Sequence, residues 1–599
     1  MSRSTRHGRW WRGRALALGA TAASCCALTG CCTAVESGDD AAPMMANGVA
    51  TVDPTPAEMP DSPLTIEESD LVKLEGDRLY VHNAARGLQV IDVSEPATPQ
   101  AVAAVADTAG ASGELYVRDD HVALIVGAPA TACPGGAASA LVEITQASTA
   151  PRAGEPLCLA GEIVASRVVG DVLYLVEVDP TPYAGLTTLR SFWFRPDVVF
   201  SAIDTLAVSG TGVEVHVTDR TIYLTRANAA DGARTVVQAF DISAGDGSIV
   251  ERGTVDVEGA PMGRFHMDES GDTFRIVTRD GDGGANLTVL DVSDLGAPAV
   301  LSTLREIAPG EELFATRFVG DRAYLVTYRP ELIVNTRQVW PGFDPLWVVS
   351  LEDPSRPVVL GELEIPGWSD YIFPRGDLLL AVGRGDGGEG IAASLFDVAD
   401  PSAPAELRRL EFGNATASSE ANTDFRGVTV VEEALGAPPL LVVPYSDNLM
   451  DGWGCRPEHH VQLVDVLDRD LALRADLSLT GRVRRTLPVG EHLYVIDEKL
   501  VTAVDVTDRD EPAFSGRVPV GDVEGADPCV IPAPAPVEQV WQTVWMEPEE
   551  FPDGHQFPDL CACSTSTQPS DCLGERAPLW VLLGLMGVVA RGRLRRRAT

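Results

Sequence analysis

The sequence predicts an all-β protein built from repeated antiparallel sheet units, and three observations support this expectation. Val, Gly, Pro and Asp recur at short intervals, while patterns typical of helices are scarce. A tight turn followed by an alternating apolar strand recurs along most of the 599 residues. A second motif, an acidic residue between apolar ones with a Pro-containing turn behind it, recurs as well. This repetition predicts the architecture of the chain and leaves its activity open.

The first motif is a Gly-Asp or similar turn that leads into a strand. The turn supplies the tight reversal of a hairpin, and the apolar strand packs between neighbouring sheets. The copies are residues 76–81, 170–175, 218–224, 320–325, 376–380 and 490–495.

The second motif contains the acidic residue that we expect to make turn or sheet-to-sheet hydrogen bonds. Its copies are residues 90–96, 141–144, 240–242, 290–294, 349–354, 396–401, 464–466 and 504–508. Successive centres lie roughly 40 to 70 residues apart. The gap between Glu143 and Asp241 is roughly 100 residues, which predicts one degenerate unit near residues 198–208.

Three to four strands in a unit of about 50 residues is the size of a β-propeller blade. A sandwich would not repeat at this period, and a β-helix would repeat faster. We therefore expect a β-propeller of about eight blades over residues 63–524, with seven or nine as alternatives. Closing the ring removes the exposed sheet edges.

The best-preserved copy of the repeat covers residues 317–371. Four of its side chains attract attention as site candidates: Arg317, Asp321, Trp347 and Trp368. Compared with the other copies, Asp321 and Trp347 are interpreted as a turn residue and a packing residue. The distinctive part of this copy is the insertion at residues 328–343, which most other copies lack.

Several segments resemble a secreted β-propeller family described as distantly related to WD-40 repeats. They are residues 67–73, 263–281, 317–329, 344–354, 360–371, 394–401 and 418–420. Residues 88–99, LQVIDVSEPATP, also resemble the LVIVD-type repeat of surface proteins. The resemblance runs from near Glu67 to near Val520 and implies a propeller and export. It implies no catalytic residue.

The formal net charge of −41 disfavours nucleic acid as a partner, because such a surface repels phosphate backbones. The acidic excess is interpreted as solubility outside the cell, with divalent-cation binding as the alternative. The acidic glycine turns at residues 280–284 and 385–389 do not match the EF-hand pattern. We expect no cofactor, and calcium stays an alternative.

Four cysteines in the body of an exported chain predict two disulfides. Cys133 and Cys158 are the natural local pair, and Cys455 with Cys529 would be the long-range pair. Three connectivities are open, and the sequence does not choose among them. Zinc is a poor alternative because no CxxC spacing occurs.

The N-terminus has the pattern of an export signal over residues 1–30, with a basic part, a short apolar part and small residues. Its end, LTGC, resembles a bacterial lipobox. That resemblance implies cleavage before Cys31 and lipidation of its sulfur, with a plain signal peptide as the alternative. Residues 31–62 are expected to form a low-order tether.

Residues 525–572 read as a Pro/Glu-rich linker that contains cysteines, and residues 573–599 combine a short hydrophobic helix with an Arg-rich end. The latter resembles a MYXO-CTERM-type sorting tail, which implies processing near Cys572 and display at the outer membrane or cell surface. A retained C-terminal anchor is the alternative. A lipid and a tail are redundant as anchors, and the sequence does not decide which one holds the mature protein.

The leading functional interpretation is a surface-displayed, non-enzymatic propeller that binds a protein or glycan partner through loops on one rim. The candidate loops are residues 180–197 and 328–343, and their aromatic residues Trp193, Phe194, Trp340 and Phe343 are the expected partner contacts. One alternative is an extracellular hydrolase with an acidic or metal site at the mouth of the channel, and another is a scaffold for envelope assembly.

No motif of a known catalytic centre supports the enzyme alternative directly. The sequence lacks a Gly-x-Ser-x-Gly elbow, a P-loop and a His-Glu-x-x-His pair. Glu458, His459 and His460 form the clustered histidine segment. Adjacent residues of a strand point to opposite faces, so we interpret this segment as loop polarity rather than a metal site.

Overall fold

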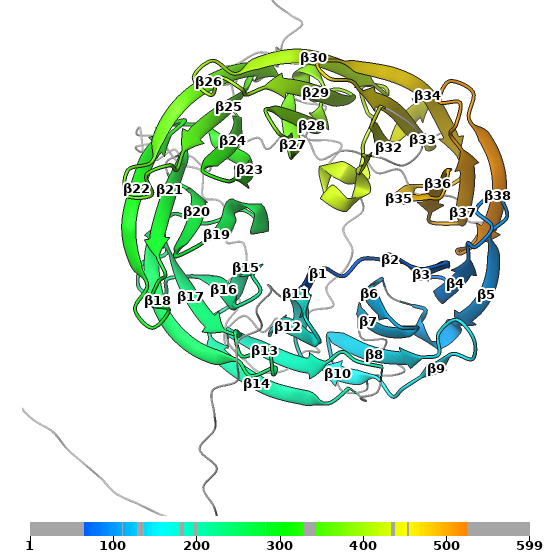
Figure 1. Cartoon of the computed structure of the whole chain (residues 1–599), viewed down its shortest axis with the longest axis horizontal. Helices are drawn as coiled ribbons and strands as arrows, with labels where there is room; N and C mark the ends of the chain where they lie inside the picture. Colours follow the sequence, from blue (N-terminus) through cyan, green and yellow to red (C-terminus); the bar gives the residue numbers. More distant parts are fainter. Residues whose placement is uncertain are drawn as a thin grey trace, which may run out of the picture. The chain divides into compact units, whose positions relative to one another are not determined.

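The computed structural model describes residues 65–110, 112–127, 133, 137–179, 185–196, 200–281, 283–328, 343–432, 438–451 and 454–523, all within one compact unit. Nine antiparallel sheets follow one another around a ring, each forming one blade (Figure 1). The predicted all-β propeller is confirmed, and the number of blades is nine, which was one of the two alternatives to about eight. No helix in the described ranges is long and apolar enough to span a membrane.

The first three blades contain the two sheets that exceed four strands. Blade 1 consists of β2 (Val72–Glu75), β3 (Arg78–Asn83), β4 (Gly87–Asp92) and β5 (Gln100–Val105). Blade 2 consists of β6 (Gly113–Arg118), β7 (His121–Gly127), β8 (Ser139–Thr145), β9 (Arg152–Ala153) and β10 (Leu157–Leu159). Blade 3 consists of β11 (Glu162–Val169), β12 (Val172–Val178), β13 (Leu186–Trp193) and β14 (Ala202–Ser209), with β1 (Ile66–Glu67) added to its first strand.

The next three blades are regular four-stranded sheets. Blade 4 consists of β15 (Gly212–Val217), β16 (Thr221–Ala227), β17 (Arg234–Asp241) and β18 (Val250–Glu258). Blade 5 consists of β19 (Met267–Ser270), β20 (Thr273–Arg279), β21 (Ala285–Asp291) and β22 (Ala299–Ile307). Blade 6 consists of β23 (Glu312–Val319), β24 (Arg322–Tyr328), β25 (Phe343–Ser350) and β26 (Val358–Pro366).

The last three blades are also four-stranded. Blade 7 consists of β27 (Trp368–Arg375), β28 (Leu378–Arg384), β29 (Ile391–Asp397) and β30 (Ala405–Phe412). Blade 8 consists of β31 (Thr429–Val431), β32 (Leu440–Asp451), β33 (Gly454–Val466) and β34 (Leu471–Leu479). Blade 9 consists of β35 (Val483–Val489), β36 (His492–Asp497), β37 (Leu500–Asp505) and β38 (Ala513–Pro519).

Five short 3-10 helices lie in the connections. They are η1 (Ala106–Thr108), η2 (Arg264–His266), η3 (Asp386–Gly388), η4 (Glu420–Asn422) and η5 (Phe425–Gly427). η2 precedes blade 5, and η4 and η5 precede blade 8. The connection that holds η4 and η5 is the yellow-green turn inside the ring in Figure 1.

The blade that raises the count to nine is blade 3, which fills the long gap between the acidic motifs. Its third strand, β13, carries no acidic residue at the motif position. It lies earlier in the chain than the expected degenerate unit at residues 198–208, which overlaps the outer strand β14 instead. The missing acidic residue is the reason why the sequence repeat shows this blade so weakly.

Each repeated motif has a physical role in its blade. The N–H group that follows the third strand donates to the carbonyl of the turn aspartate, as from Val93 to Asp77 (3.0 Å) and from Leu351 to Asp321 (2.8 Å). The motif aspartate accepts from the residue two positions later, as in the pairs Asp92–Ser94, Asp241–Ser243, Asp291–Ser293 and Asp505–Thr507. The interpretation of these aspartates as turn residues is confirmed.

Neighbouring blades pack through apolar strand faces and through one recurring outer contact. A glycine of the fourth strand meets the Pro-containing turn of the next blade, as Gly361 does at Pro401 and Pro404. Gly516 of blade 9 meets Ala97 and Pro99 of blade 1 in the same way. An apolar cluster containing Val81 and Tyr494 also joins blades 1 and 9. The ring therefore closes with the contact that joins its other blades.

The N-terminal segment enters the ring on the inside. β1 pairs antiparallel with the first strand of blade 3, with Ile66 opposite Val169, before the chain crosses to blade 1 (Figure 1). Asp70 then forms an isolated bridge with Leu115 of blade 2. Residues 66–71 thus run along the inner strands of two blades that follow them in sequence.

Candidate functional site

A cavity of about 1590 Å³ occupies one mouth of the central channel. Its lining comes from all nine blades or from the connections that enter them. The beginnings of the innermost strands contribute, among others, Glu162, Glu214 and Arg484. The hairpins between second and third strands contribute residues 83–85 and 497–499.

These contributions place the cavity on the face opposite the repeated turns. Strands alternate in direction within each blade, so the first turn and the third turn lie at one end and the second turn at the other. The Gly-Asp turns and the Pro-containing turns therefore share one face, here called the turn face. The hairpins between second and third strands, where they are described, lie at the opposite face, which is the channel mouth.

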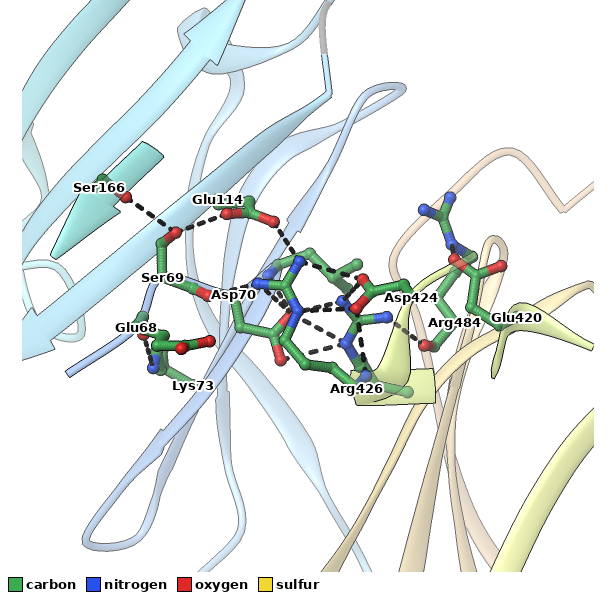
Figure 2. Close-up of polar contacts among 12 residues, drawn as sticks. Glu68, Ser69, Asp70, Lys73, Glu114, Ser166, Glu420, Asp424, Arg426 and Arg484 are labelled. Atoms are coloured by element: carbon green, nitrogen blue, oxygen red, sulfur yellow. Dashed lines mark hydrogen bonds and ion pairs between the residues drawn. The ribbon is translucent and has the colours of Figure 1, made fainter. Parts of the chain in front are cut away.

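An ion-pair network crosses part of this mouth (Figure 2). Arg426 of η5 reaches Glu114 of blade 2 at 2.6 Å, and its Nη1 donates to the carbonyl of Ser69 at 2.5 Å. The same guanidinium pairs with Asp424 at 2.9 Å. The Ser69 hydroxyl in turn donates to Glu114 at 2.5 Å. The connection before blade 8 is thereby fixed to the N-terminal segment and to blade 2.

Arg485 of β35 completes this network from the last blade. It pairs with Asp70 at 2.8 Å and with Asp424 at 2.5 Å, and its side chain is 4% exposed. Burial alone would raise the pKa of Asp424, but hydrogen bonds from Arg426 and the charge of Arg485 outweigh it and lower that pKa to about 2. The Asp424 carboxylate therefore stays ionised near neutral pH, and the network joins η5, the N-terminal segment and blade 9.

A second group of charges lies beside this network and is less fully paired. The Glu68 carboxylate bridges Arg167 at 3.1 Å and Arg264 at 3.0 Å. The backbone carbonyl of Glu68 accepts from Nζ of Lys73 at 2.5 Å. Glu68, Arg167 and Arg264 all line the cavity. One carboxylate thus faces two guanidinium groups at the wall of the channel.

Three aromatic rings form the wall next to Arg264. Phe265 contacts Tyr371 and Phe425 with ring centroids 5.2 and 5.1 Å apart, and the Tyr371 and Phe425 rings stack at 5.3 Å. The Arg264 guanidinium lies 4.5 Å from the Phe425 centroid. Arg317 lies 5.6 Å from that of Phe265. Two cations therefore flank an aromatic cluster built from η2, β27 and η5.

Two further carboxylates line the cavity. Burial raises the pKa of Glu214 on β15, and the charge of Arg264 opposes that rise. Asp370 accepts from the Asn422 side chain at 2.6 Å. Within the described ranges, no group of three or more His, Cys, Asp or Glu side chains is arranged to hold a metal ion.

The structure relocates the aromatic residues expected to contact a partner. Of the predicted loop at residues 180–197, the structure describes residues 185–196, and most of these form β13 rather than a loop. Phe194 follows that strand at 0% exposure and packs on His121 with centroids 5.5 Å apart, so it offers no surface to a partner. Trp193 is half-buried at the turn-face end of β13, with the Arg195 guanidinium 4.4 Å from its ring.

For the other predicted site residues, the structure describes either the backbone alone or nothing at all. Phe343 begins β25, but its side chain is not described. Cys455 lies in β33 and its side chain is likewise not described. Trp340, Cys529, Cys31 and Cys572 lie outside the described residues. Their expected roles stay predictions.

Cys133 and Cys158 form a disulfide with Cα atoms 5.6 Å apart, which is the expected local pair. The histidine pair diverges as neighbours on a strand should. His459 contacts the Ser446 hydroxyl through Nδ1 at 2.8 Å, while His460 pairs with Asp476 at 3.0 Å. The two imidazoles therefore do not converge on one site.

Sequence reasoning missed most of the channel residues, although a signal was present. Glu68, Arg264, Arg317 and Tyr371 all lie in segments that carry the family resemblance, yet none belongs to a repeated motif. The repeat explains turns and packing but not these residues. Nothing in the local pattern indicated that Phe425 would contact Arg264 and Tyr371. Nor did it indicate that Arg426 and Arg485 would pair with Asp424.

Comparisons with known proteins agree with the architecture. A family model described as a beta propeller domain matches residues 64–192 and 200–509. An uncharacterized protein of Methanocaldococcus jannaschii is 37% identical over 158 residues, which are 25% of this chain and 23% of the relative. One of Archaeoglobus fulgidus is 29% identical over 186 residues, 31% and 26% of the two chains. The chain thus spans about a quarter of the length of these curated relatives.

Two solved structures show the range of structural similarity. Kluyveromyces lactis Hsv2 aligns with a TM-score of 0.33 at 11% identity, covering 56% of this chain and 95% of that one. Chaetomium thermophilum Sqt1 aligns with a TM-score of 0.35 at 11% identity, covering 56% and 79%.

Proposed function

The chain belongs to this family of β-propeller domains, and we propose that it is a binding module that takes a segment of a partner into its channel mouth. The observation that carries the proposal is the cavity of about 1590 Å³ at the channel mouth, which is lined by all nine blades or by the connections that enter them. Its wall combines aromatic rings with charged groups, the composition typical of binding sites with a few orienting polar contacts.

The proposal includes export and display at the cell surface. Its support is the lipobox-like end at Cys31 and the sorting-type tail at residues 573–599. Mass spectrometry of the mature protein tests it directly. A diacylglyceryl group on Cys31 or cleavage near Cys572 is the expected result, and an unprocessed chain found inside the cell contradicts it.

Site-specific photo-crosslinking in the cells that make the protein tests the binding function. A benzophenone amino acid at Met262, exposed at the cavity, should capture a defined partner. The same group at Glu95, exposed on the turn face, is the matched control. An equal yield from both positions, or none from Met262, overturns the proposal.

A second candidate function is hydrolysis of an extracellular glycan, and Glu214 is the observation that favours it. A carboxyl group whose pKa is raised by burial suits a general acid, and Glu214 lines the cavity. Release of reducing ends from polysaccharides, abolished by Glu214→Gln, would establish the enzyme. Crosslinking from Met262 without release of reducing ends would favour the binding module over the hydrolase.

A further inference from the structure

The chain itself shows that an extended peptide fits in the channel. Residues 66–67 add a short strand to the inner edge of blade 3, and Asp70 bridges to Leu115 with N to O distances of 3.3 and 2.7 Å. Backbone pairing at a free strand edge is a general mode of peptide recognition. The neighbouring inner strand β15 pairs only with β16 among the described strands, so no other described strand occupies its channel edge.

The same segment shows how an acidic side chain is held there. The Glu68 carboxylate receives one ion pair from Arg167 and one from Arg264, at 3.1 and 3.0 Å. Pairs between guanidinium and carboxylate groups are the strong, oriented kind of hydrogen bond. The channel wall therefore contains a site that binds a carboxylate, and Glu68 of the chain itself occupies part of this site.

Arg264 has donor groups that Glu68 does not use. A guanidinium carries five N–H donors, and the described contacts of Arg264 are the ion pair with Glu68 and the rings of Phe265 and Phe425. By contrast, Arg426 is ion-paired with three carboxylates and Arg485 with two, and each also donates to a backbone carbonyl. Arg264 lines the cavity, and so its remaining donors are available to a ligand.

We propose that the channel mouth binds an extended acidic peptide of a partner, with a carboxylate on Arg264 and the backbone beside Glu68 along β15. This inference rests on the proposed binding function and names the chemistry of its partner. The net charge of −41 opposes the approach of such a peptide. At physiological salt that repulsion is screened beyond about 8 Å, so the local guanidinium groups dominate once the peptide is in the channel.

The test measures binding of a fluorescent peptide to the full chain. The probe copies residues 65–71, TIEESDL, and its neutral control is TIQQSNL. We expect the acidic probe to bind about tenfold more tightly than the neutral one, which is the scale of one charge-assisted contact. Arg264→Gln should weaken binding by a similar factor, while Arg264→Lys retains part of it.

The decisive variant is Glu68→Gln, because it removes the competing carboxylate. We expect it to tighten binding of the acidic probe, whereas Arg264→Gln weakens it. A residue that only stabilises the fold would not produce opposite signs in the two variants. Arg356→Gln, exposed on the turn face, is the matched control and should change nothing. Circular dichroism confirms that each variant is folded.

The remaining outcomes separate this inference from the proposed function. Binding of an oligogalacturonate that depends on Arg264, without binding of TIEESDL, would identify an acidic glycan and overturn the peptide assignment alone. Equal affinity for the acidic and neutral probes also overturns it, even if Met262 crosslinks a partner. Failure of every probe together with failure of the Met262 crosslink overturns both.

Discussion

Arg485 of the last blade is ion-paired with Asp70, which precedes the first blade, with Nη2 2.8 Å from Oδ1 and the two residues 415 positions apart. No strand is shared between blades 9 and 1. Side-chain contacts such as this pair, together with the apolar cluster of Val81 and Tyr494, therefore close the ring. The channel mouth and the ring closure thus depend on overlapping residues.

Replacing Arg485 should destabilise the propeller strongly. In Arg485→Met, the carboxylates of Asp70 and Asp424 lose a buried cation that contacts both. Removing one partner of a buried pair costs about 3 kcal/mol or more, and we expect that fall in the free energy of unfolding. Guanidinium denaturation measures it.

The control also lacks the Arg485 cation, but it neutralises the two carboxylates that lose Arg485 as a partner. Adding Asp70→Asn and Asp424→Asn to Arg485→Met should recover at least half of the loss, because the neutral groups no longer oppose each other. A loss for Arg485→Met of less than about 1 kcal/mol, typical of a surface pair, contradicts a role in ring closure.

The same network predicts a loss of stability in acid. Asp424 has a pKa of about 2 in the folded chain and about 3.9 when unfolded. Because the pKa of Asp424 is lower in the folded chain, its ionised carboxylate stabilises the folded state at pH values above about 4. That stabilisation disappears as the pH falls from about 4 to about 2. Thermal unfolding across this range measures it. Asp424→Asn should be less stable than the wild type near neutral pH, and its thermal unfolding midpoint should fall less between about pH 4 and about pH 2. If the midpoints of the two proteins fall in parallel with pH, Asp424 is not the group responsible.

The repeat predicted most of the fold because its turns are local. Asp77 and Asp321 form the same backbone contact in different blades, and one short pattern describes both. Blade 3 was expected only as a degenerate unit near residues 198–208, because β13 lacks the acidic residue that marks the third strand in the other blades. Local pattern therefore identifies a blade only where the turn chemistry is preserved.

The channel site could not be predicted in the same way, because its residues meet only after the ring forms. Arg264, Tyr371 and Phe425 come from three elements well separated in sequence, and no spacing rule relates them. Phe194 shows the reverse case. An aromatic residue near an apparent insertion suggested a contact surface, yet the strand buries it completely.

The disulfide between Cys133 and Cys158 should stabilise blade 2. It closes a loop with a sequence separation of 25 residues, for which the loss of unfolded-state entropy amounts to about 3 kcal/mol. The double variant Cys133→Ala, Cys158→Ala should lower the free energy of unfolding by about that amount. Adding a reductant to the wild type should reproduce the loss. If the reductant lowers the stability of the double variant equally, another bond is responsible.

Adding a methyl group at Gly516 should weaken the contact that joins blades 9 and 1. A Cβ there would lie 2.5 Å from Cδ of Pro99 and 2.7 Å from the carbonyl oxygen of Ala97, both too close for carbon. Overpacking of this kind costs roughly 1–3 kcal/mol, so Gly516→Ala should lower the free energy of unfolding by that amount. Gly232, which has nothing within 4 Å of an added Cβ, is the matched control, and Gly232→Ala should be neutral. Gly361→Ala, at the corresponding contact between blades 6 and 7, should cost a similar amount. If Gly361→Ala is costly and Gly516→Ala is neutral, the ring is not closed by the contact that joins its other blades.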